Sequence, residues 1–168
     1  MSGESIDELD LRVLFEAARW APSAGNSQPW RMLYARRDTE HWPLFFDLLT
    51  ERNKLWCVNA AALVCFVSTA TSDQGRPLAT HSYDTGAAWE NFALQGMVNG
   101  FVVHGMQGFD YVRARTTLRV PDDCRVEAMA AVGRPGPLSA LDESFRAREM
   151  PSGRKPLGEI VCEGVFDL

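Results

Sequence analysis

The stretch AAALVCFVST at residues 60–69 decides how this chain folds. It carries no charge and holds β-branched residues, which favours a strand over a helix. Polar and apolar residues do not alternate along it, so we expect a central strand buried on both faces. Such a strand needs a covering layer on each side, which the flanking sequence should supply.

The sequence before this strand predicts two amphipathic helices and a further strand. Ser5 and Glu8 have the spacing of a capping box, and the apolar residues that follow place a first helix up to Pro22. That helix must end there because proline disfavours helical geometry in the residue before it. We expect a strand at residues 30–34 and a second helix at residues 42–53.

The sequence after the central strand predicts a long helix of unusual composition. It covers residues 85–99, follows Asp84 as a candidate cap, and contains Glu90 as its only charge. Apolar residues occupy every side of it, so it should be enclosed by its own domain or by a partner chain. The other expected elements are a strand at residues 101–104, a short helix to residue 118 capped by Asp110, a strand at residues 125–132 and a polar helix at residues 138–148.

The chain ends in a segment, about residues 150–168, whose apolar side chains have no obvious partner within the sequence. Its 168 residues are enough for one domain, and no internal repeat or low-complexity segment divides them. Helices and strands alternate irregularly along the chain. This order favours an α+β sandwich over a doubly wound parallel sheet.

Composition and charge exclude several classes of protein. Hydrophobic residues make up 46% and charged residues 23%, as in a globular domain. The 17 Lys and Arg stand against 22 Asp and Glu, and a net charge of -5 does not favour a nucleic-acid partner. No run approaches the roughly 18 apolar residues of a membrane span, and the N-terminus does not resemble a secretory signal. We therefore expect a cytoplasmic protein with no membrane partner.

The residues that usually carry chemistry do not form a recognisable catalytic or metal site. His81 and Asp84 have the spacing of a metal or base pair, but a loop histidine beside a helix cap is favoured because no third ligand accompanies them. Motifs for nucleotide phosphates, serine hydrolases and zinc proteases are absent. Without C-x-x-C spacing, we expect reduced, mostly buried thiols at Cys57, Cys65, Cys124 and Cys162. Chemistry in such a chain usually belongs to a cofactor.

Five ordered segments resemble motifs of the nitroreductase family of FMN-dependent oxidoreductases. They are AARWAPSAGNSQPW at residues 17–30, NKLW at 53–56, DTGAAWEN at 84–91, HGMQGFD at 104–110 and GRKPL at 153–157. The resemblance implies a nitroreductase-like α/β/α sandwich with a mostly antiparallel central sheet, in a single domain over residues 1–168. It also implies an intertwined homodimer in which the tail from about residue 150 reaches the partner subunit, which fits the apolar helix and the unpartnered tail.

The resemblance implies a site for FMN assembled from four parts of the chain. In the family, the loop after the first helix lines the isoalloxazine, and its counterparts here are Pro22, Ser23, Ala24, Asn26 and Gln28. An asparagine bonds the pyrimidine edge, a turn presents backbone N–H to flavin N5, and a basic pair suits the phosphate. Their counterparts are Asn53, then Met106, Gln107 and Gly108, then Arg154 and Lys155. Only a backbone role is carried over for Gln107, because relatives often have another residue there.

Each of these segments also has a simpler explanation. The loop fits a turn between helix and strand, and Asn53 taken alone fits a helix C-cap equally well. The adjacent cations Arg154 and Lys155 would usually be solvated surface.

The resemblance further implies an NAD(P)H-dependent enzyme. Hydride passes to FMN and then, in ping-pong order, to an electron-poor small molecule such as a nitroaromatic or a quinone. The chemistry belongs to the flavin, so no side chain is assigned a catalytic role and no metal is expected. Dehalogenation, or the use of reduced flavin as a substrate, is less favoured because the sequence shows no insertion that would form a lid.

The start of the chain departs from the family pattern. Relatives carry an R-[RW]-S-x-R type segment upstream of the first helix, which holds the FMN phosphate, whereas this sequence begins at Met1 without it. Two hypotheses follow: the native product is longer, or this member has lost part of the site. Either predicts weak or absent FMN, and the alternative function is a degenerate dimer that binds flavin weakly or not at all and lacks catalysis.

Overall fold

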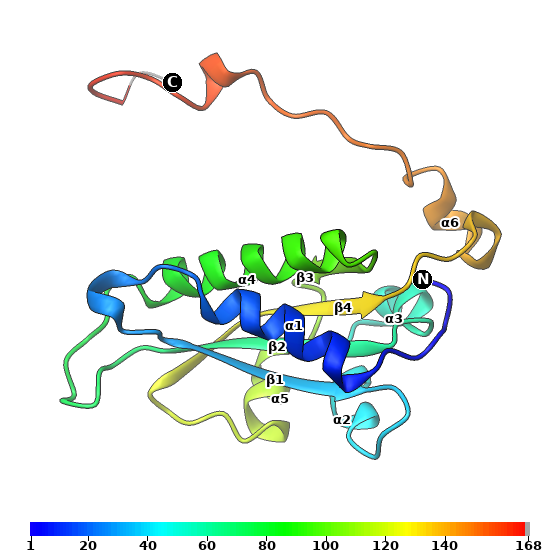
Figure 1. The fold of residues 1–168 in the computed structure, drawn as a ribbon, viewed down its shortest axis with the longest axis horizontal. Helices are drawn as coiled ribbons and strands as arrows, with labels where there is room; N and C mark the ends of the chain where they lie inside the picture. The colour runs from blue at the N-terminus through cyan, green and yellow to red at the C-terminus, as the bar shows by residue number, and fades with distance from the viewer. Residues whose placement is uncertain (167–168) are drawn as a thin grey trace.

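A four-stranded antiparallel sheet forms the centre of the molecule (Figure 1). The structure, a computed structural model, describes residues 1–166. The strand order is β1–β2–β4–β3, and every neighbouring pair is antiparallel. The strands are β1 (Trp30–Arg36), β2 (Ala62–Thr69), β3 (Val102–Met106) and β4 (Cys124–Gly133). Each strand predicted from the sequence is therefore present, with bounds that differ by a few residues.

The position of β2 confirms the interpretation of the AAALVCFVST stretch. It lies between β1 and β4, and residues 62–68 are buried. Alternate side chains enter two different apolar clusters, because successive residues of a strand point to opposite faces. One cluster receives Leu63, Cys65 and Val67, and the other receives Ala62, Val64 and Phe66.

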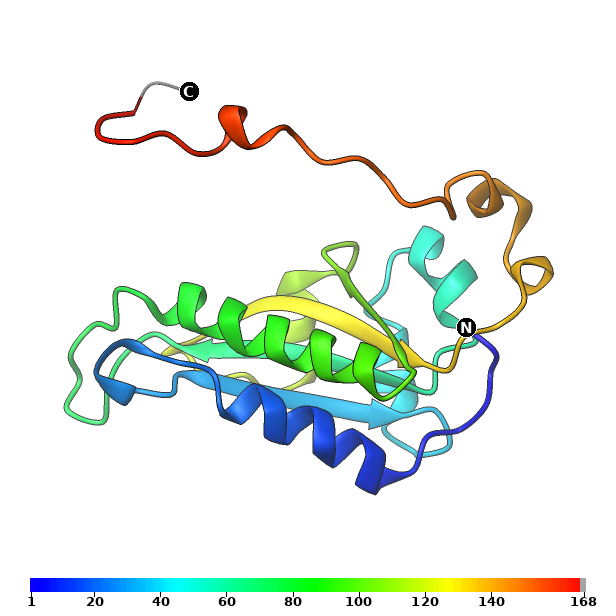
Figure 2. The same cartoon turned by 45° about the horizontal axis from the view of Figure 1, so that its top comes forward.

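Helices cover both faces of the sheet (Figure 2). On one face lie α1 (Glu8–Arg19) and α4 (His81–Val98), which share an apolar cluster with the Val64 side of β2. On the other lie α2 (Trp42–Phe46), α3 (Glu51–Cys57) and α5 (Tyr111–Thr117), which pack with the Leu63 side. This arrangement is the predicted α/β/α sandwich.

The first helix begins later than the capping-box pattern predicted. It starts at Glu8, Ser5 lies before it, and its N-cap makes no side-chain bond, so the predicted capping box is wrong. The residues before α1 begin beside the end of β4, where the Ser2 N–H donates to the Arg134 carbonyl. Further along this segment, the side chain of Ile6 is buried in the core. These contacts hold the segment in an extended conformation.

The helix expected at residues 42–53 is split into α2 and α3. The Thr50 N–H donates to the Gly108 carbonyl at 3.0 Å, and Leu49 forms a β-bridge with Phe109. The Thr50 N–H is therefore not available for the hydrogen bond that it would make in a continuous helix. The break brings the start of α3 against the turn that joins β3 to α5.

The chain after β4 leaves the sandwich (Figure 1). The polar helix expected at residues 138–148 is only a 3-10 turn (Leu138–Ala140) and the short helix α6 (Glu143–Arg146), and neither buries a residue. Residues 150–166, called the tail below, are exposed and contain one 3-10 turn (Leu157–Glu159).

 No described residue of the tail is buried against the sandwich, and residues 167 and 168 lie outside the described range.

Two properties of residues 1–166 bear on the expected chemistry. No helix among them is long and apolar enough to cross a membrane, and no cluster of three His, Cys, Asp or Glu side chains could hold a metal ion. All four cysteines are free. Cys57 and Cys65 are buried, but Cys124 is half-buried and Cys162 is exposed, so the prediction of mostly buried thiols holds for only half of them.

Candidate functional site

Asn53 lies against the 106–108 turn, and the resemblance implies that both line the FMN. It lies in the first turn of α3, and its Nδ2 donates to the carbonyl oxygen of Gly108 at 3.0 Å. The Thr50 N–H donates to the same carbonyl, and the Trp56 indole Nε1 donates to Asn53 Oδ1 at 3.2 Å. The alternative of a helix C-cap is wrong, because Asn53 lies at the start of α3 and not at its end.

Gly108 is required by the close approach of α3 to this turn. A Cβ at this position would lie 2.5 Å from Asn53 Nδ2 and 3.2 Å from Thr50 Oγ1. The first distance is shorter than any real contact of a Cβ atom, so a larger residue would push the Asn53 amide away. Glycine therefore serves here to leave space for a neighbouring side chain.

An aromatic pair packs beside Asn53. The ring centroids of Trp56 and His104 are 4.6 Å apart, with the planes inclined at 59°. Partial burial lowers the pKa of His104, and the Glu149 carboxylate opposes this shift without cancelling it. The imidazole is therefore mostly neutral at pH 7. Trp56 is held both by its contact with the His104 ring and by its hydrogen bond to Asn53.

An open pocket of about 440 Å³ adjoins the 106–108 turn. Its lining includes the aromatic rings of Trp89 and Tyr111 together with Met106, Gln107 and Glu127. Burial raises the pKa of Tyr111, and the nearby Glu127 carboxylate raises it further, so the phenol stays protonated at neutral pH. The pocket is of a size that admits a small aromatic molecule.

The 23–28 loop is folded on itself in a strained conformation. Asn26 and Gln28 have φ values of 55° and 48°, in the left-handed region that non-glycine residues rarely adopt. Ser23 Oγ accepts the Gln28 N–H at 3.0 Å, and Gln28 Nε2 donates to the Asn26 carbonyl at 3.2 Å. Pro22, just before the loop, is exposed, and so are Ala24, Gly25, Asn26 and Gln28 within it. Strained backbone with exposed amide side chains is typical of ligand-binding loops.

Asp84 anchors this loop and does not cap α4. The helix begins at His81, one turn earlier than predicted, so the predicted cap is wrong and Asp84 lies in the first turn, 4% exposed. Its Oδ2 accepts the Ala24 N–H at 3.2 Å and the Thr80 hydroxyl at 3.0 Å. A carboxylate in this turn also interacts favourably with the helix dipole. Local sequence patterns do not indicate this role, because Ala24 is 60 residues away along the chain.

His81 makes contacts with residues other than Asp84. Its Nδ1 lies 2.7 Å from Ser68 Oγ, and the Glu127 carboxylate accepts the hydroxyls of Ser68 and Ser82, each at 2.6 Å. Ser68 is fully buried, and the network satisfies its hydroxyl while tying α4 to β2 and β4. Within residues 1–166, no hydrogen bond or ion pair joins His81 to Asp84, so the metal or base pair considered from the spacing is not formed.

The 23–28 loop and α3, the helix that contains Asn53, lie toward opposite ends of the sheet (Figure 1). The loop leads into β1, whose first residue pairs with Ser68 near the end of β2, whereas α3 leads toward Ala62 at its start. At about 3.3 Å per residue, the strand between these ends spans about 20 Å. One chain therefore does not bring the loop and Asn53 around a single crevice.

The basic pair Arg154 and Lys155 lies on the exposed tail. The Arg154 guanidinium donates to the carbonyl oxygens of Ser152 and Gly153, at 3.2 Å and 3.0 Å. Within one chain, the structure does not bring this pair together with Asn53 or with the 23–28 loop.

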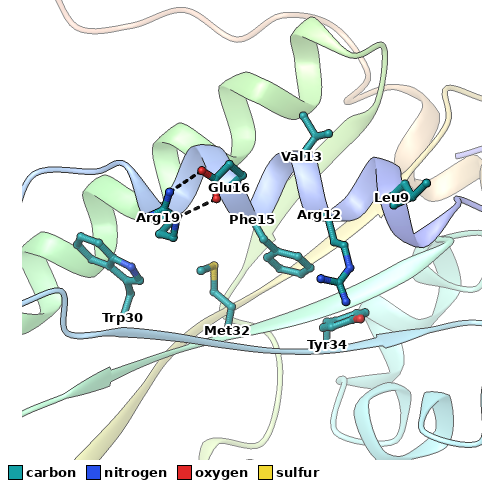
Figure 3. A pocket seen from close by; sticks show the side chains of 9 residues that line it. All are labelled: Leu9, Arg12, Val13, Phe15, Glu16, Arg19, Trp30, Met32 and Tyr34. Carbon is teal, nitrogen blue, oxygen red and sulfur yellow. Dashed lines mark hydrogen bonds and ion pairs between the residues drawn. The ribbon is translucent and has the colours of Figure 1, made fainter.

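A groove of about 800 Å³ lies between α1 and the edge strand β1 (Figure 3). We call it the α1–β1 groove. Glu16 and Arg19 form an ion pair of 2.6 Å on its helical side, and the Arg19 hydrogen bonds lower the pKa of Glu16 to about 2. Among the described strands, none pairs with the outer edge of β1. The apolar lining is Leu9, Val13 and Phe15 from α1, and Trp30, Met32 and Tyr34 from β1.

Comparison with known proteins identifies the family. A sequence model of the nitroreductase family matches residues 2–55. An uncharacterised 15.4 kDa protein of Mycolicibacterium smegmatis is 31% identical over 110 residues, which cover 63% of this chain and 70% of that protein. The crystal structure of an oxidoreductase containing FMN is 42% identical, with a TM-score of 0.94 over 99% of this chain and 86% of that one. The chain belongs to the nitroreductase family.

The fold of this chain is shared by more distant structures. A nitroreductase family protein from Streptococcus pneumoniae TIGR4 is 21% identical, with a TM-score of 0.74 over 96% of this chain and 92% of that one. In this chain, the DTGAAWEN motif attaches α4 to its surroundings. Asp84 bonds the 23–28 loop, and Asn91 Nδ2 donates to the Ala17 carbonyl near the end of α1 at 3.2 Å.

Proposed function

We propose that this nitroreductase is an FMN-dependent oxidoreductase that takes hydride from NAD(P)H and passes it to an electron-poor small molecule. The observation that carries the proposal is the Asn53 amide, which is fixed by Gly108 and Trp56 and still has one N–H and one oxygen lone pair to offer. These two groups suit the imide edge of an isoalloxazine, where an N–H lies beside carbonyl oxygens. The relative that contains FMN, 42% identical, supports the same assignment.

The residues around the 106–108 turn fit FMN and a second small molecule. Gly108 leaves room for the Asn53 amide, and the pocket beside Met106 and Gln107 is open to solvent. Bound FMN supplies the hydride chemistry, and the chain binds it, orients it and limits the access of water. The aromatic rings of Trp89 and Tyr111 suit a planar, electron-poor partner, which favours nitroaromatic or quinone acceptors. A single pocket used by donor and acceptor in turn gives ping-pong order.

We infer that each FMN lies between two copies of the chain. Asn53 and the 106–108 turn would come from one protomer, and the 23–28 loop would come from its partner. The loop leads into β1 and the 106–108 turn follows β3, and these two strands are the opposite edges of the sheet, which supports this arrangement. The outer face of α4 supports it too, since it exposes a group of apolar side chains of the kind that marks interfaces: Tyr83, Leu94, Met97 and Val98.

The tail gives this homodimer a second contact. Its exposed apolar residues include Leu157, Ile160 and Val161. An extended segment of this kind suits the α1–β1 groove, because an edge strand offers unpaired backbone groups as well as apolar surface. The exchanged tail would also carry Arg154 and Lys155 to the partner, where a guanidinium and an ammonium suit the FMN phosphate.

An anaerobic titration tests the proposed function. The purified protein is incubated with FMN, freed of excess flavin, and titrated with NADH and with NADPH while the visible flavin absorbance is followed. We expect one of them to bleach the bound flavin and p-benzoquinone or a nitrofuran to restore the colour. Protein that retains no FMN would support the degenerate dimer instead. Retained FMN that neither NADH nor NADPH reduces would refute hydride transfer.

A further inference from the structure

The Asn53 amide is held in one of its two possible orientations. The Trp56 indole N–H can only donate, and it meets Oδ1 at 3.2 Å. The Gly108 carbonyl can only accept, and it meets Nδ2 at 3.0 Å. The two neighbours therefore demand the same orientation. Turning the amide over would set donor against donor and acceptor against acceptor.

We propose that Trp56 is a positioning residue for FMN. Its indole N–H holds the Asn53 amide in the orientation that presents one N–H and one lone pair, side by side, to the imide edge of the flavin. This inference rests on the proposed function. The Gly108 carbonyl is shared with the Thr50 N–H, so Trp56 supplies the second fixed point that orients the amide plane.

Trp56 is itself fixed before any ligand arrives. Its side chain is half-buried, and the His104 ring packs against it at a centroid distance of 4.6 Å. The indole is therefore a rigid donor, and an amide oriented in advance loses less conformational freedom when a ligand binds.

Replacing Trp56 with phenylalanine removes the donor and keeps an aromatic ring against His104. A neutral hydrogen bond of this kind contributes to affinity on a scale of about 2- to 10-fold in Kd. If Trp56 acts by positioning Asn53, its substitution should change the FMN Kd only when Asn53 is present. A general structural role of Trp56 would change the Kd with or without Asn53. In an Asn53→Ala background the same substitution should change the Kd by less than about 2-fold.

The experiment is a double-mutant cycle on the FMN Kd. Flavin fluorescence is titrated with wild-type protein, Trp56→Phe, Asn53→Ala and the double variant, all freed of flavin. Trp42→Phe is the matched control, since that indole stacks on Phe46 in α2 and should leave the Kd unchanged. A second readout needs no ligand: in the flavin-free protein, NMR should show faster solvent exchange of the Asn53 side-chain amide in Trp56→Phe than in Trp42→Phe.

The outcomes distinguish this inference from the proposed function. A larger Kd for Trp56→Phe in the wild-type background alone, with faster amide exchange, supports it. Equal effects in both backgrounds, or none in either, would overturn it and leave the proposed function standing. A wild-type protein that takes up no FMN would overturn the proposed function, and this inference with it.

Discussion

Replacing Asp84 tests how α4 and the 23–28 loop are held together. The carboxylate is 4% exposed, and its Oδ2 accepts both the Ala24 N–H at 3.2 Å and the Thr80 hydroxyl at 3.0 Å. Asp84→Ala removes both hydrogen bonds and the charge. Asp84→Asn keeps the shape of the side chain and a neutral acceptor oxygen, so it separates the loss of charge from the loss of the bonds.

The expected magnitude follows from these two hydrogen bonds. Each bond to a charged group contributes about 1.5–3 kcal/mol. Ala24 is exposed, so its N–H regains water after the substitution and its bond contributes at the lower end of that range. We therefore expect Asp84→Ala to lower the free energy of unfolding by about 3 kcal/mol, and Asp84→Asn by about half as much. A domain with a stability of about 5–15 kcal/mol should still fold.

Urea unfolding of the flavin-free protein measures this loss. All variants are compared at one protein concentration, because the stability of an oligomer depends on concentration. Asp110→Ala is the control: Asp110 is an exposed cap of α5 that accepts the Arg113 N–H at 2.9 Å, and its loss should lower stability by about 1 kcal/mol. If Asp84→Ala were no more destabilising than Asp110→Ala, the anchoring role of the buried carboxylate would be refuted.

Three further predictions concern the turn, the thiols and an ion pair. Gly108→Ala should displace the Asn53 amide and weaken FMN binding at least about tenfold in a fluorescence titration. Glu16 should titrate at about 2 by NMR and return toward ordinary glutamate values in Arg19→Ala. Because folding lowers this pKa, the contribution of Glu16 to stability is present above about 4.5 and is lost as the pH falls toward 2. Burial raises thiol pKa values, to about 12 for Cys65, so iodoacetamide should label Cys162 first, Cys124 more slowly, and Cys57 and Cys65 only after unfolding.

Local patterns predicted the elements whose stabilising contacts are local. Asp110 caps α5 as expected, and the uncharged run at residues 60–69 contains the central strand. Contacts between distant residues were not predictable in the same way. The bond from Thr50 to Gly108 splits a helix that periodicity presents as continuous. The carboxylate of Asp84 has the sequence signature of a cap and serves instead as an acceptor for a loop.

The candidate site was predictable only in part. The family motifs selected Asn53 and the 106–108 turn, which the structure brings into contact. They gave no sign that Trp56 would bond the same amide, because that contact depends on how α3 packs. A carboxylate in the otherwise apolar part of β4 could have indicated Glu127 as a member of a buried polar network. Periodicity carries no information on how subunits are arranged, so it does not predict which protomer supplies the 23–28 loop to the proposed FMN site.

Complementation between two defective variants tests most directly whether FMN is shared between chains. One variant carries Gly108→Ala, which displaces the Asn53 amide, and the other carries Ala24→Trp, which fills the exposed face of the 23–28 loop. With a different affinity tag on each, heterodimers are purified and their flavin is counted. A shared site predicts about one FMN for each pair of chains, because one of the two sites then contains no substitution. A site built within one chain predicts no flavin, as in either homodimer, and that result would contradict the account.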